Sequence, residues 1–405
     1  MITLSVFIPF ALGYFLSYLF RAVNAVIAPD LVADLGLDAA DLGLLTSAYF
    51  LTFAAFQIPL GILLDRFGPR RTEAALLAFA ALGAFVFAQS DTLIGLIAGR
   101  ALIGLGVSAC LMAAFKAFVM WFDRQRLPLI NGIQMGAGGL GAMAATAPVE
   151  AALDFTDWRG VFTILAVATA AIALVIYLVV PKKETGHSGE GLGGQMGGVA
   201  EIFTSPVFWR IAPLTVMSQA SFLSIQSLWS GPWLRDVAGL DRGGVAEHLL
   251  MIAAAMIAGF LLIGLIAERL GRLGIHTAAV AVIGMSAFML AQAAIVLQWT
   301  DSGLLAWIFF GFFGTAGILP YAALLQGFRR ELAGRVVTGL NVIVFAAAFA
   351  GQWGIGAVID LWPQTATGGY DADSYQAAFA MMLALQVLAL AWLAAFKKAP
   401  LKLFK

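Results

Sequence analysis

Charged residues, cysteine and histidine are scarce in this sequence. Only 11% of its 405 residues are charged, against about 25% in a typical soluble domain, and 61% are hydrophobic. A chain of this length cannot cover a water-facing surface with so little charge, which argues against a soluble enzyme. The single cysteine, Cys110, excludes an internal disulfide and a cysteine-rich metal site. One cysteine and three histidines supply no set of nucleophile, base and metal, so the sequence predicts neither enzymatic activity nor a cofactor.

Long apolar stretches make up most of the chain. A helix that spans a bilayer needs about 20 mainly apolar residues. Twelve such segments are bounded by charged residues, proline or glycine: 6–28, 40–64, 73–90, 93–121, 129–152, 160–181, 206–230, 245–267, 274–297, 303–327, 336–361 and 376–396. The first lacks a basic region and a cleavage site, so we expect a membrane helix rather than a removable signal. The sequence therefore predicts an all-α membrane protein with 12 transmembrane helices.

An internal repeat divides these helices into two sets of six. GILLDRFG at Gly61–Gly68 recurs as GLIAERLG at Gly264–Gly271, 203 positions later and again after the second helix of a set. A polar, glycine-rich stretch lies between segments six and seven and is typical of a flexible linker. We therefore predict pseudo-symmetric halves at 1–181 and 206–405 with a cytoplasmic linker at 182–205. Parallel repeats of this kind occur in secondary transporters.

The distribution of lysine and arginine predicts the orientation, because cytoplasmic loops carry the positive excess. With a cytoplasmic N-terminus, the opposite side holds only Arg159, Arg235 and Arg242. The cytoplasmic side then holds sixteen basic residues: Arg66, Arg70, Arg71, Arg124, Arg126, Lys182, Lys183, Arg269, Arg272, Arg329, Arg330, Arg335, Lys397, Lys398, Lys402 and Lys405. We expect a multi-pass protein of a bacterial-type inner membrane with both termini in the cytoplasm.

The first copy of the repeat, continued to Arg71, resembles the loop between helices 2 and 3 of the major facilitator superfamily (MFS). Arg100-x-x-x-Gly104-x-Gly106 resembles the second motif of this family, and Asp157-Trp158-Arg159 resembles the start of its helix 6. The resemblance covers the whole chain and implies a monomeric transporter that rocks between inward- and outward-facing states. It also implies a gate cluster, which closes the cytoplasmic side in the outward-facing state: Gly61, Asp65, Arg66, Arg70, Arg71, Arg100, Gly264, Glu268 and Arg269.

Arg21 lies just past the middle of the first segment, where an arginine costs about 2.5 to 3.5 kcal/mol on insertion scales. Tyr14, Ser17, Tyr18 and Asn24 follow the same helical stripe and would face an aqueous cavity with it. The sequence around Arg21 resembles the first helix of the organic-anion and organophosphate branches of the family, where an arginine holds a carboxylate or phosphate. A structural or gating role for Arg21 stays open.

Carboxylates are expected only toward the ends of the predicted spans. The sequence therefore shows no ion-pair partner for Arg21. It also shows no acidic residue near the middle of a span that could carry a coupled proton. Glu150 and Asp360 at the periplasmic ends, Arg100 acting with one of them, and exchange of anions remain alternatives for coupling. Further candidate substrate contacts are Lys116, Gln219, Gln226, Trp229 and Tyr321. Each of these types more often makes a helix-to-helix hydrogen bond or reaches the membrane interface.

The predicted substrate is a small organic anion, a carboxylate or a phosphate ester, and no nucleic acid is expected. The main alternative is an exporter of amphipathic, drug-like compounds, although Ala137 stands where the exporter pattern has proline. A copper importer is a lesser alternative, because soft donors such as His248, Met251 and Met256 are scattered. The third alternative is a non-transporting sensor or assembly factor built on a transporter scaffold.

Overall fold

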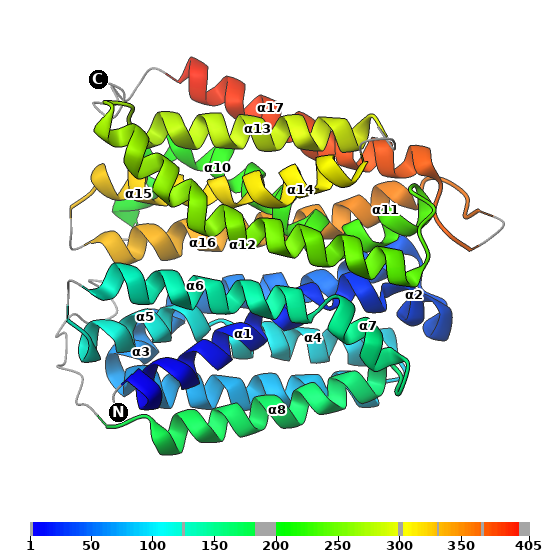
Figure 1. Ribbon diagram of the computed structural model, residues 1–405, viewed down its shortest axis with the longest axis horizontal. Helices are drawn as coiled ribbons and strands as arrows, with labels where there is room; N and C mark the ends of the chain where they lie inside the picture. Colours follow the sequence, from blue (N-terminus) through cyan, green and yellow to red (C-terminus); the bar gives the residue numbers. More distant parts are fainter. Residues whose placement is uncertain are drawn as a thin grey trace.

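The computed structural model is helical throughout the residues that it describes, 3–123, 126–182, 200–298, 303–329, 332–365 and 368–396 (Figure 1). The N-terminal half contains η1 (Thr3–Phe7), α1 (Ile8–Ala22), α2 (Asn24–Leu35), α3 (Ala39–Gln89), α4 (Leu93–Val107), α5 (Cys110–Trp121), α6 (Leu127–Ala144), α7 (Ala147–Leu153) and α8 (Trp158–Val179). The C-terminal half contains α10 (Pro206–Ser224), η3 (Ile225–Trp229), α11 (Ser230–Asp236), α12 (Arg242–Arg272), α13 (Thr277–Val296), α14 (Gly303–Gly314), η5 (Thr315–Ile318), α15 (Leu319–Gln326), α16 (Ala333–Ile359) and α17 (Ala372–Ala395).

Twelve helical passes follow from these elements. Within the described residues, nine helical stretches are long and apolar enough to span a membrane. One of them, α3, is two passes, because Gly68 with φ of 75° interrupts it and the chain folds back. Two further passes are interrupted helices, α6 with α7 and α10 with η3 and α11. The predicted fold class is therefore confirmed, and Figure 1 separates the halves, with α1–α8 in the lower part and α10–α17 in the upper.

The first pass is longer than the sequence analysis predicted. It runs from Thr3 to Leu35 with one irregular residue at Val23, rather than from 6 to 28. Pro29 lies inside α2 without ending it, although proline removes one backbone hydrogen bond to the carbonyl of Ala25. Gly231 packs directly over that carbonyl, so the freed group lies under a close helix contact. The extension places Arg21 near the centre of the pass.

The bundle has a linker end, which includes Asp65–Arg71, Pro181 and Arg329, and a far end, which includes Asp34, Asp154 and Asp360. Five helices that start at the far end have an N-cap side chain that accepts a backbone N–H: Asp38, Thr92, Asp157, Asp241 and Asp371. Such caps satisfy donors that no helical carbonyl reaches. They fix where each pass begins after its loop.

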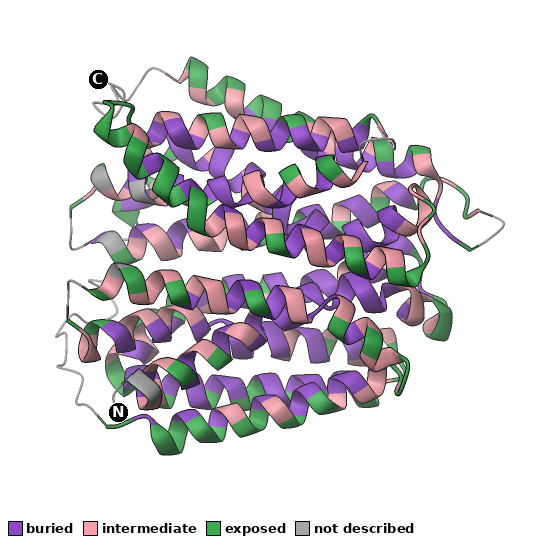
Figure 2. Ribbon diagram, viewed as in Figure 1, coloured by how far each residue is buried: buried purple, intermediate pink, exposed green. Residues whose placement is uncertain are grey.

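Side chains that face away from the bundle are apolar, as a lipid environment requires. On α8, Ile164, Val167, Leu174 and Leu178 are each more than half exposed. Figure 2 shows α8 and α17 at the outer edges with mixed exposed and buried faces, whereas the inner helices are mainly buried. The apolar composition thus covers a surface that contacts lipid and does not indicate an oversized core.

Several predictions lie outside the described residues. These are the basic residues Arg124, Lys183, Arg330, Lys397, Lys398, Lys402 and Lys405, together with most of the predicted linker. The boundaries 1–181, 182–205 and 206–405 stay predictions.

Small residues on α6 let its backbone approach neighbouring helices. A Cβ added to Gly141 would lie 2.1 Å from the backbone oxygen of Phe15, and one added to Gly139 would lie 2.3 Å from Ile257. A Cβ added to Gly132 or Gly136, which lie nearer the linker end, would have no atom within 4 Å. The glycine-rich helix therefore packs closely over only part of its length.

We predict that Gly141→Ala lowers the thermal stability of the purified protein, because the new methyl group meets backbone that cannot rotate away. Overpacking of this kind typically costs about 1 to 3 kcal/mol. Gly132→Ala, on the same helix with open space beside it, is the matched control and should leave the melting temperature unchanged or slightly raised. Equal destabilisation by both changes would contradict the packing described here.

Candidate functional site

Arg21 lies in the middle of the first pass and is enclosed by aromatic rings. Its side chain is 6% exposed. The guanidinium carbon lies 4.5 Å from the ring centre of Tyr18, 5.8 Å from Tyr49, 5.7 Å from Phe53 and 5.4 Å from Phe345. Cation–π contacts of this kind stabilise a desolvated cation in part. Three rings come from the N-terminal half and Phe345 comes from α16, so the enclosure spans both halves.

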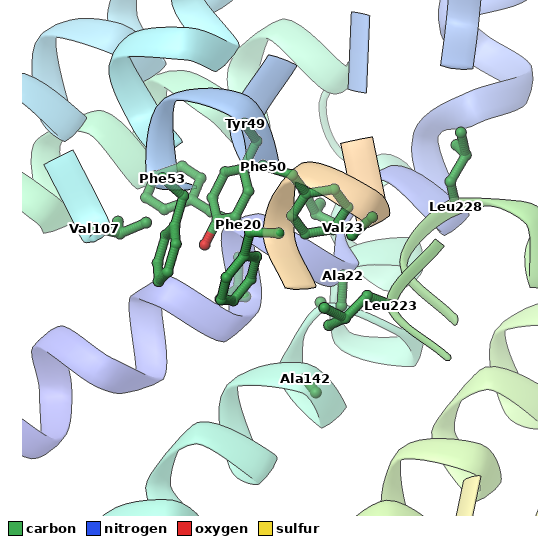
Figure 3. Close-up of a cluster of buried hydrophobic side chains, with 14 of the residues drawn as sticks. Phe20, Ala22, Val23, Tyr49, Phe50, Phe53, Val107, Ala142, Leu223 and Leu228 are labelled. Atoms are coloured by element: carbon green, nitrogen blue, oxygen red, sulfur yellow. The ribbon is translucent and has the colours of Figure 1, made fainter. Parts of the chain in front are cut away.

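Aromatic and aliphatic side chains pack around the same position. Figure 3 shows Tyr49, Phe50 and Phe53 of α3 gathered beside Phe20 and Val23 of the first pass. The rings of Phe53 and Phe345 are 4.3 Å apart between centres, which closes the contact between α3 and α16. Arg21 is thus held in an apolar setting in which a hydrogen-bond acceptor would be strongly attracted.

Arg21 lacks a carboxylate partner within the described part of the chain. The seven ion pairs found there do not include it. Its Nε is buried and has no hydrogen-bond partner. A guanidinium with an unused donor in an apolar enclosure can engage an anion, because carboxylate and phosphate oxygens match its planar donors.

The other residues of the predicted helical stripe lie on the first pass with Arg21, and they differ in how fully their polar groups are bonded. Tyr14 and Tyr18 pack edge to face at 5.2 Å and cover Gly138 of α6. The Tyr49 hydroxyl donates to the Ser17 carbonyl at 3.2 Å, and the Ser17 hydroxyl lies 3.5 Å from the Tyr49 hydroxyl. Asn24 is 2% exposed and its Oδ1 has no partner. Tyr14, Ser17 and Tyr18 therefore form one wall with Arg21, and Asn24 lies beyond the irregular turn at Val23.

The candidate contacts on the C-terminal half do not converge on Arg21. Gln219 packs against Gly317 of η5, and the Tyr321 hydroxyl donates to Asn341 Oδ1 at 2.7 Å. Trp229 is fully buried and donates from Nε1 to the backbone oxygen of Gln352 at 3.0 Å. Gln226 is 8% exposed on η3, which contacts α1 and α2. Of these four, Gln226 and Trp229 lie on the element that adjoins the first pass, and the Trp229 donor is already taken by Gln352.

Lys116 lies at the linker end, where the structure pairs it with the gate cluster. Its Nζ is 2.5 Å from Asp65 Oδ1 and donates to the Leu64 carbonyl at 2.8 Å. These contacts join α5 to the end of the second pass within one half. The structure therefore places Lys116 away from Arg21 and beside Asp65.

The gate cluster is spread over both halves of the linker end without interlocking there. Gly61 and Gly264, the equivalent repeat positions, have nothing within 4 Å of an added Cβ. Glu268 pairs with Arg272 one turn along its own helix, and Arg70 donates to the Tyr177 carbonyl of the same half. Arg66, Arg71 and Arg269 are exposed. The two copies of the repeat are therefore disengaged in this conformation.

Arg100 lies apart from the rest of the gate cluster, inside the N-terminal half. It is fully buried, and its Nη1 donates to the Phe20 carbonyl at 3.1 Å. Nε and Nη2 have no partners, while the rings of Tyr49, Phe87 and Phe162 lie within about 6 Å of its guanidinium. Arg100 therefore ties α4 to the first pass one residue before Arg21.

Ionic contacts join the two halves at the far end. Arg242, at the start of α12, donates to both oxygens of Asp30 at 2.8 and 3.0 Å. Its Nε also donates to Glu150 at 2.8 Å. Asp30 and Glu150 belong to the first and fifth passes, so one arginine of the C-terminal half holds two helices of the other half.

A second polar contact closes the far end between α3 and α16. Asp360 accepts the backbone N–H groups of Ala39 and Ala40 at 3.0 and 2.6 Å. Burial raises the pKa of Asp360, while the hydrogen bonds from Ala40 and Ala39 act in the opposite direction. Gln352 donates to Thr46 at 2.9 Å along the same seam. With the linker-end repeats disengaged, these contacts describe a conformation closed at the far end.

Glu73 is a buried acid that the sequence analysis missed. It is fully buried, and neither carboxyl oxygen has a hydrogen-bond partner. Glu73 does lie toward one end of its span, as the sequence analysis expected of carboxylates, but its side chain is buried between helices. The predicted third segment began at Glu73, which suggested an interfacial position, but the helix resumes directly after Gly68 and turns this side chain inward. The run of apolar residues alone could not reveal that direction.

A hollow lies at the far-end surface. It has a volume of about 830 Å³, and its lining includes five carboxylates, Asp30, Asp34, Glu150, Asp154 and Asp157, with Arg242. Arg242 is already engaged by two of them. Such a surface repels anions, so it does not compete with Arg21 as an anion site.

Comparison with known proteins agrees with this architecture. The family model described as Major Facilitator Superfamily matches residues 10–352. A probable sulfoacetate transporter of Cupriavidus necator is 23% identical over 68% of this chain and 68% of its own length. The MFS-type transporter YhjX of Escherichia coli is 26% identical over 77% of this chain and 76% of its own. The solved structure of a bacterial homologue of the human lysosomal transporter Spinster, inward-facing and occupied, has a TM-score of 0.78 at 17% identity, covering 100% of this chain and 98% of that one.

We predict that Arg242→Ala shifts the protein toward a conformation open at the far end, because it removes both ionic links to the other half. An exposed ion pair contributes up to about 1 kcal/mol, so we expect a population change of about five-fold. Spin labels at Phe155 and Leu361, exposed far-end positions of opposite halves, in a Cys110→Ala background would report the distance.

Asp91→Asn is the control for this experiment, because it removes the ion pair of Asp91 with Arg159 inside one half. Its distance distribution should match that of the unsubstituted protein. A distribution unchanged by Arg242→Ala would show that the Arg242 contacts do not hold the far end closed.

Proposed function

The chain belongs to the Major Facilitator Superfamily and is a membrane transporter of small molecules, and we propose that its substrate is a small organic anion, either a carboxylate or a phosphate ester. Transport is secondary and proceeds by alternating access, in which the two halves rock about a site near Arg21. The protein works as a monomer, and the linker end faces the cytoplasm of a bacterial-type cell.

The environment of Arg21 carries this proposal. A guanidinium that is 6% exposed and ringed by four aromatic side chains presents an unused Nε donor to an anion. An anionic substrate supplies that partner and is released when the enclosure opens. Tyr14, Tyr18 and Tyr49 are polar groups beside Arg21 that could complete the site, with Ser17 bonded to Tyr49, Gln226 on the adjoining η3 and Asn24 beyond Val23.

The relative from Cupriavidus necator supports an anion, since its printed substrate, sulfoacetate, carries a carboxylate and a sulfonate. At 23% identity this likeness suggests a chemical class and not a compound. A cationic drug is disfavoured by the same arginine, because a buried guanidinium repels positive charge. The exporter alternative therefore predicts the opposite ligand preference and is tested by the same experiment.

Orientation follows from the positive excess at the linker end, which includes Arg66, Arg70, Arg71, Arg269 and Arg272. With that end in the cytoplasm, the conformation closed at the far end is inward-facing. Lys116 then belongs to the gate through its pairing with Asp65, and Trp229 belongs to the far-end closure. We assign neither of them to the substrate.

We predict that organic anions raise the melting temperature of the detergent-purified protein and that Arg21→Ala abolishes this shift. Loss of one partner of a buried charge pair costs about 2 to 5 kcal/mol, which weakens binding about 30-fold or more. Arg21→Lys should restore little, because the planar donor fork is lost. The screen compares sulfoacetate, other carboxylates, phosphate esters, organic cations and neutral compounds.

The control variant is Arg272→Ala, which removes an exposed guanidinium paired only within its own helix. It should keep the full anion response. Stabilisation by cations or apolar compounds, equal in the wild type and Arg21→Ala, would reject the anion proposal and favour the exporter. Wild-type affinity in Arg21→Lys would reduce Arg21 to a general positive charge.

We further predict that Asp65→Asn slows transport while ligand affinity stays nearly unchanged, because Asp65 acts in the gate and not at Arg21. Removing an interaction worth about 1.4 kcal/mol in the slow conformational step reduces turnover about ten-fold. The measurement is flux into proteoliposomes of the anion that the thermal screen identifies. Asp154→Asn, an exposed far-end carboxyl, serves as the control, and unchanged turnover in Asp65→Asn would remove the gate assignment.

A further inference from the structure

Glu73 is positioned where three helices of the N-terminal half meet. A Cβ added to Gly13 of α1 would lie 2.3 Å from Glu73 Oε1, so the carboxyl group rests against the bare backbone of α1. The thiol of Cys110, the first residue of α5, also contacts the carboxyl. Any residue larger than glycine at position 13 would occupy the space that the carboxyl fills.

No ordinary hydrogen bond or ion pair compensates a charge at this position among the described residues. Both oxygens of Glu73 are buried and without a partner, and the side chain is 0% exposed. The seven ion pairs of the described chain do not include Glu73. A thiol is a weak donor and cannot replace water around a carboxylate. Burying an uncompensated carboxylate is so costly that the group stays protonated instead.

The titratable groups on the surrounding helices leave this conclusion unchanged. On α1, Tyr14 donates toward Met135, and Arg21 lies eight residues beyond Gly13, which is about 12 Å along the helix. On α5, Lys116 is engaged by Asp65, which leaves Cys110 as the titratable group beside Glu73. Arg100 of α4 donates to the Phe20 carbonyl. On α8, Tyr177 and Arg159 lie at opposite ends of the helix.

We propose that Glu73 is a proton-binding site whose occupancy depends on the packing of α1 against α3 and α5. In the conformation described, α1 covers the carboxyl, and the proton is held on one of its oxygens. When α1 moves away, water reaches the group, the O–H bond ionises, and the proton passes to water. When α1 returns, the carboxylate takes a proton from water before it is covered again.

The same helix carries Arg21, and in this respect the inference rests on the proposed function. A movement of α1 changes both the hydration of Glu73 and the enclosure of Arg21. Substrate binding at Arg21 and proton binding at Glu73 then act on one element, which is the requirement for two ligands to influence each other's affinity. The site supplies the titratable group that proton-coupled transport requires.

The test is a pH titration of the purified full chain in lipid nanodiscs, followed by infrared spectroscopy of the carboxylic acid C=O stretch. We expect a protonated band that persists at neutral pH in the wild type and is lost in Glu73→Gln. Glu247→Gln is the matched control, because Glu247 is an exposed glutamate on α12, and it should keep the band. Absence of the band in the wild type at neutral pH would overturn the proposal.

Two further variants test the dependence on α1. Gly13→Ala should displace the carboxyl and shift the frequency of the band, and an unchanged frequency would mean that the group does not rest on α1. Arg242→Ala, whose opening of the far end is measured independently with spin labels, should move the titration midpoint to lower pH. The same midpoint in an opened Arg242→Ala protein would refute the coupling to conformation.

These measurements need no substrate. A thermal screen in which no anion binds would reject the proposed function and leave the infrared result standing. Conversely, anion binding that requires Arg21, together with a missing Glu73 band, would keep the proposed function and reject the proton site.

Discussion

The low polarity of the bundle interior governs every charged group in this protein. A side chain that loses water there must gain a partner or give up its charge. Most polar side chains meet this demand locally, as Thr46 and Ser227 do by donating to carbonyls one turn earlier. Among the described residues, the buried charged side chains with an unpartnered nitrogen or oxygen atom are Arg21, Arg100 and Glu73, and all three belong to the N-terminal half. In the C-terminal half, Ser221 and Gln386 both donate to Gln292 Oε1, while Gln386 Oε1 has no partner. Buried charged groups with unpartnered atoms are therefore concentrated in the N-terminal half of the described chain.

The sequence predicted the fold well, because the fold depends on features that can be read directly from the order of residues along the chain. Apolar length gave the helical passes, and the repeat at Gly61 and Gly264 gave the two halves. The limits of the first pass were less predictable, since whether Pro29 ends a helix depends on what packs over the freed carbonyl. Here Gly231 provides that packing, from a position 202 residues away.

The candidate site was predicted in part. The sequence predicted that Arg21 has no ion-pair partner, because no acidic residue was expected at the same depth in the membrane. It did not predict the aromatic rings of Tyr49, Phe53 and Phe345 around Arg21, because these residues lie far from it along the chain. Glu73 was missed because one or two residues of uncertainty at a helix start decide whether a side chain faces water or the interior. Lys116 and Trp229 were expected near the substrate, but their partners, Asp65 and the Gln352 carbonyl, belong to other helices and become apparent only in three dimensions.

The ion pair between Lys116 and Asp65 has a consequence for the speed of the cycle. In the conformation described, Asp65 is already neutralised by a lysine of its own half. If the linker end closes by presenting Asp65 to the opposite half, one charged contact is exchanged for another and none is created. The two end states then differ little in electrostatic energy, and neither becomes a trap. A transporter needs such a balance, since a deep preference for either state would have to be overcome in every turnover.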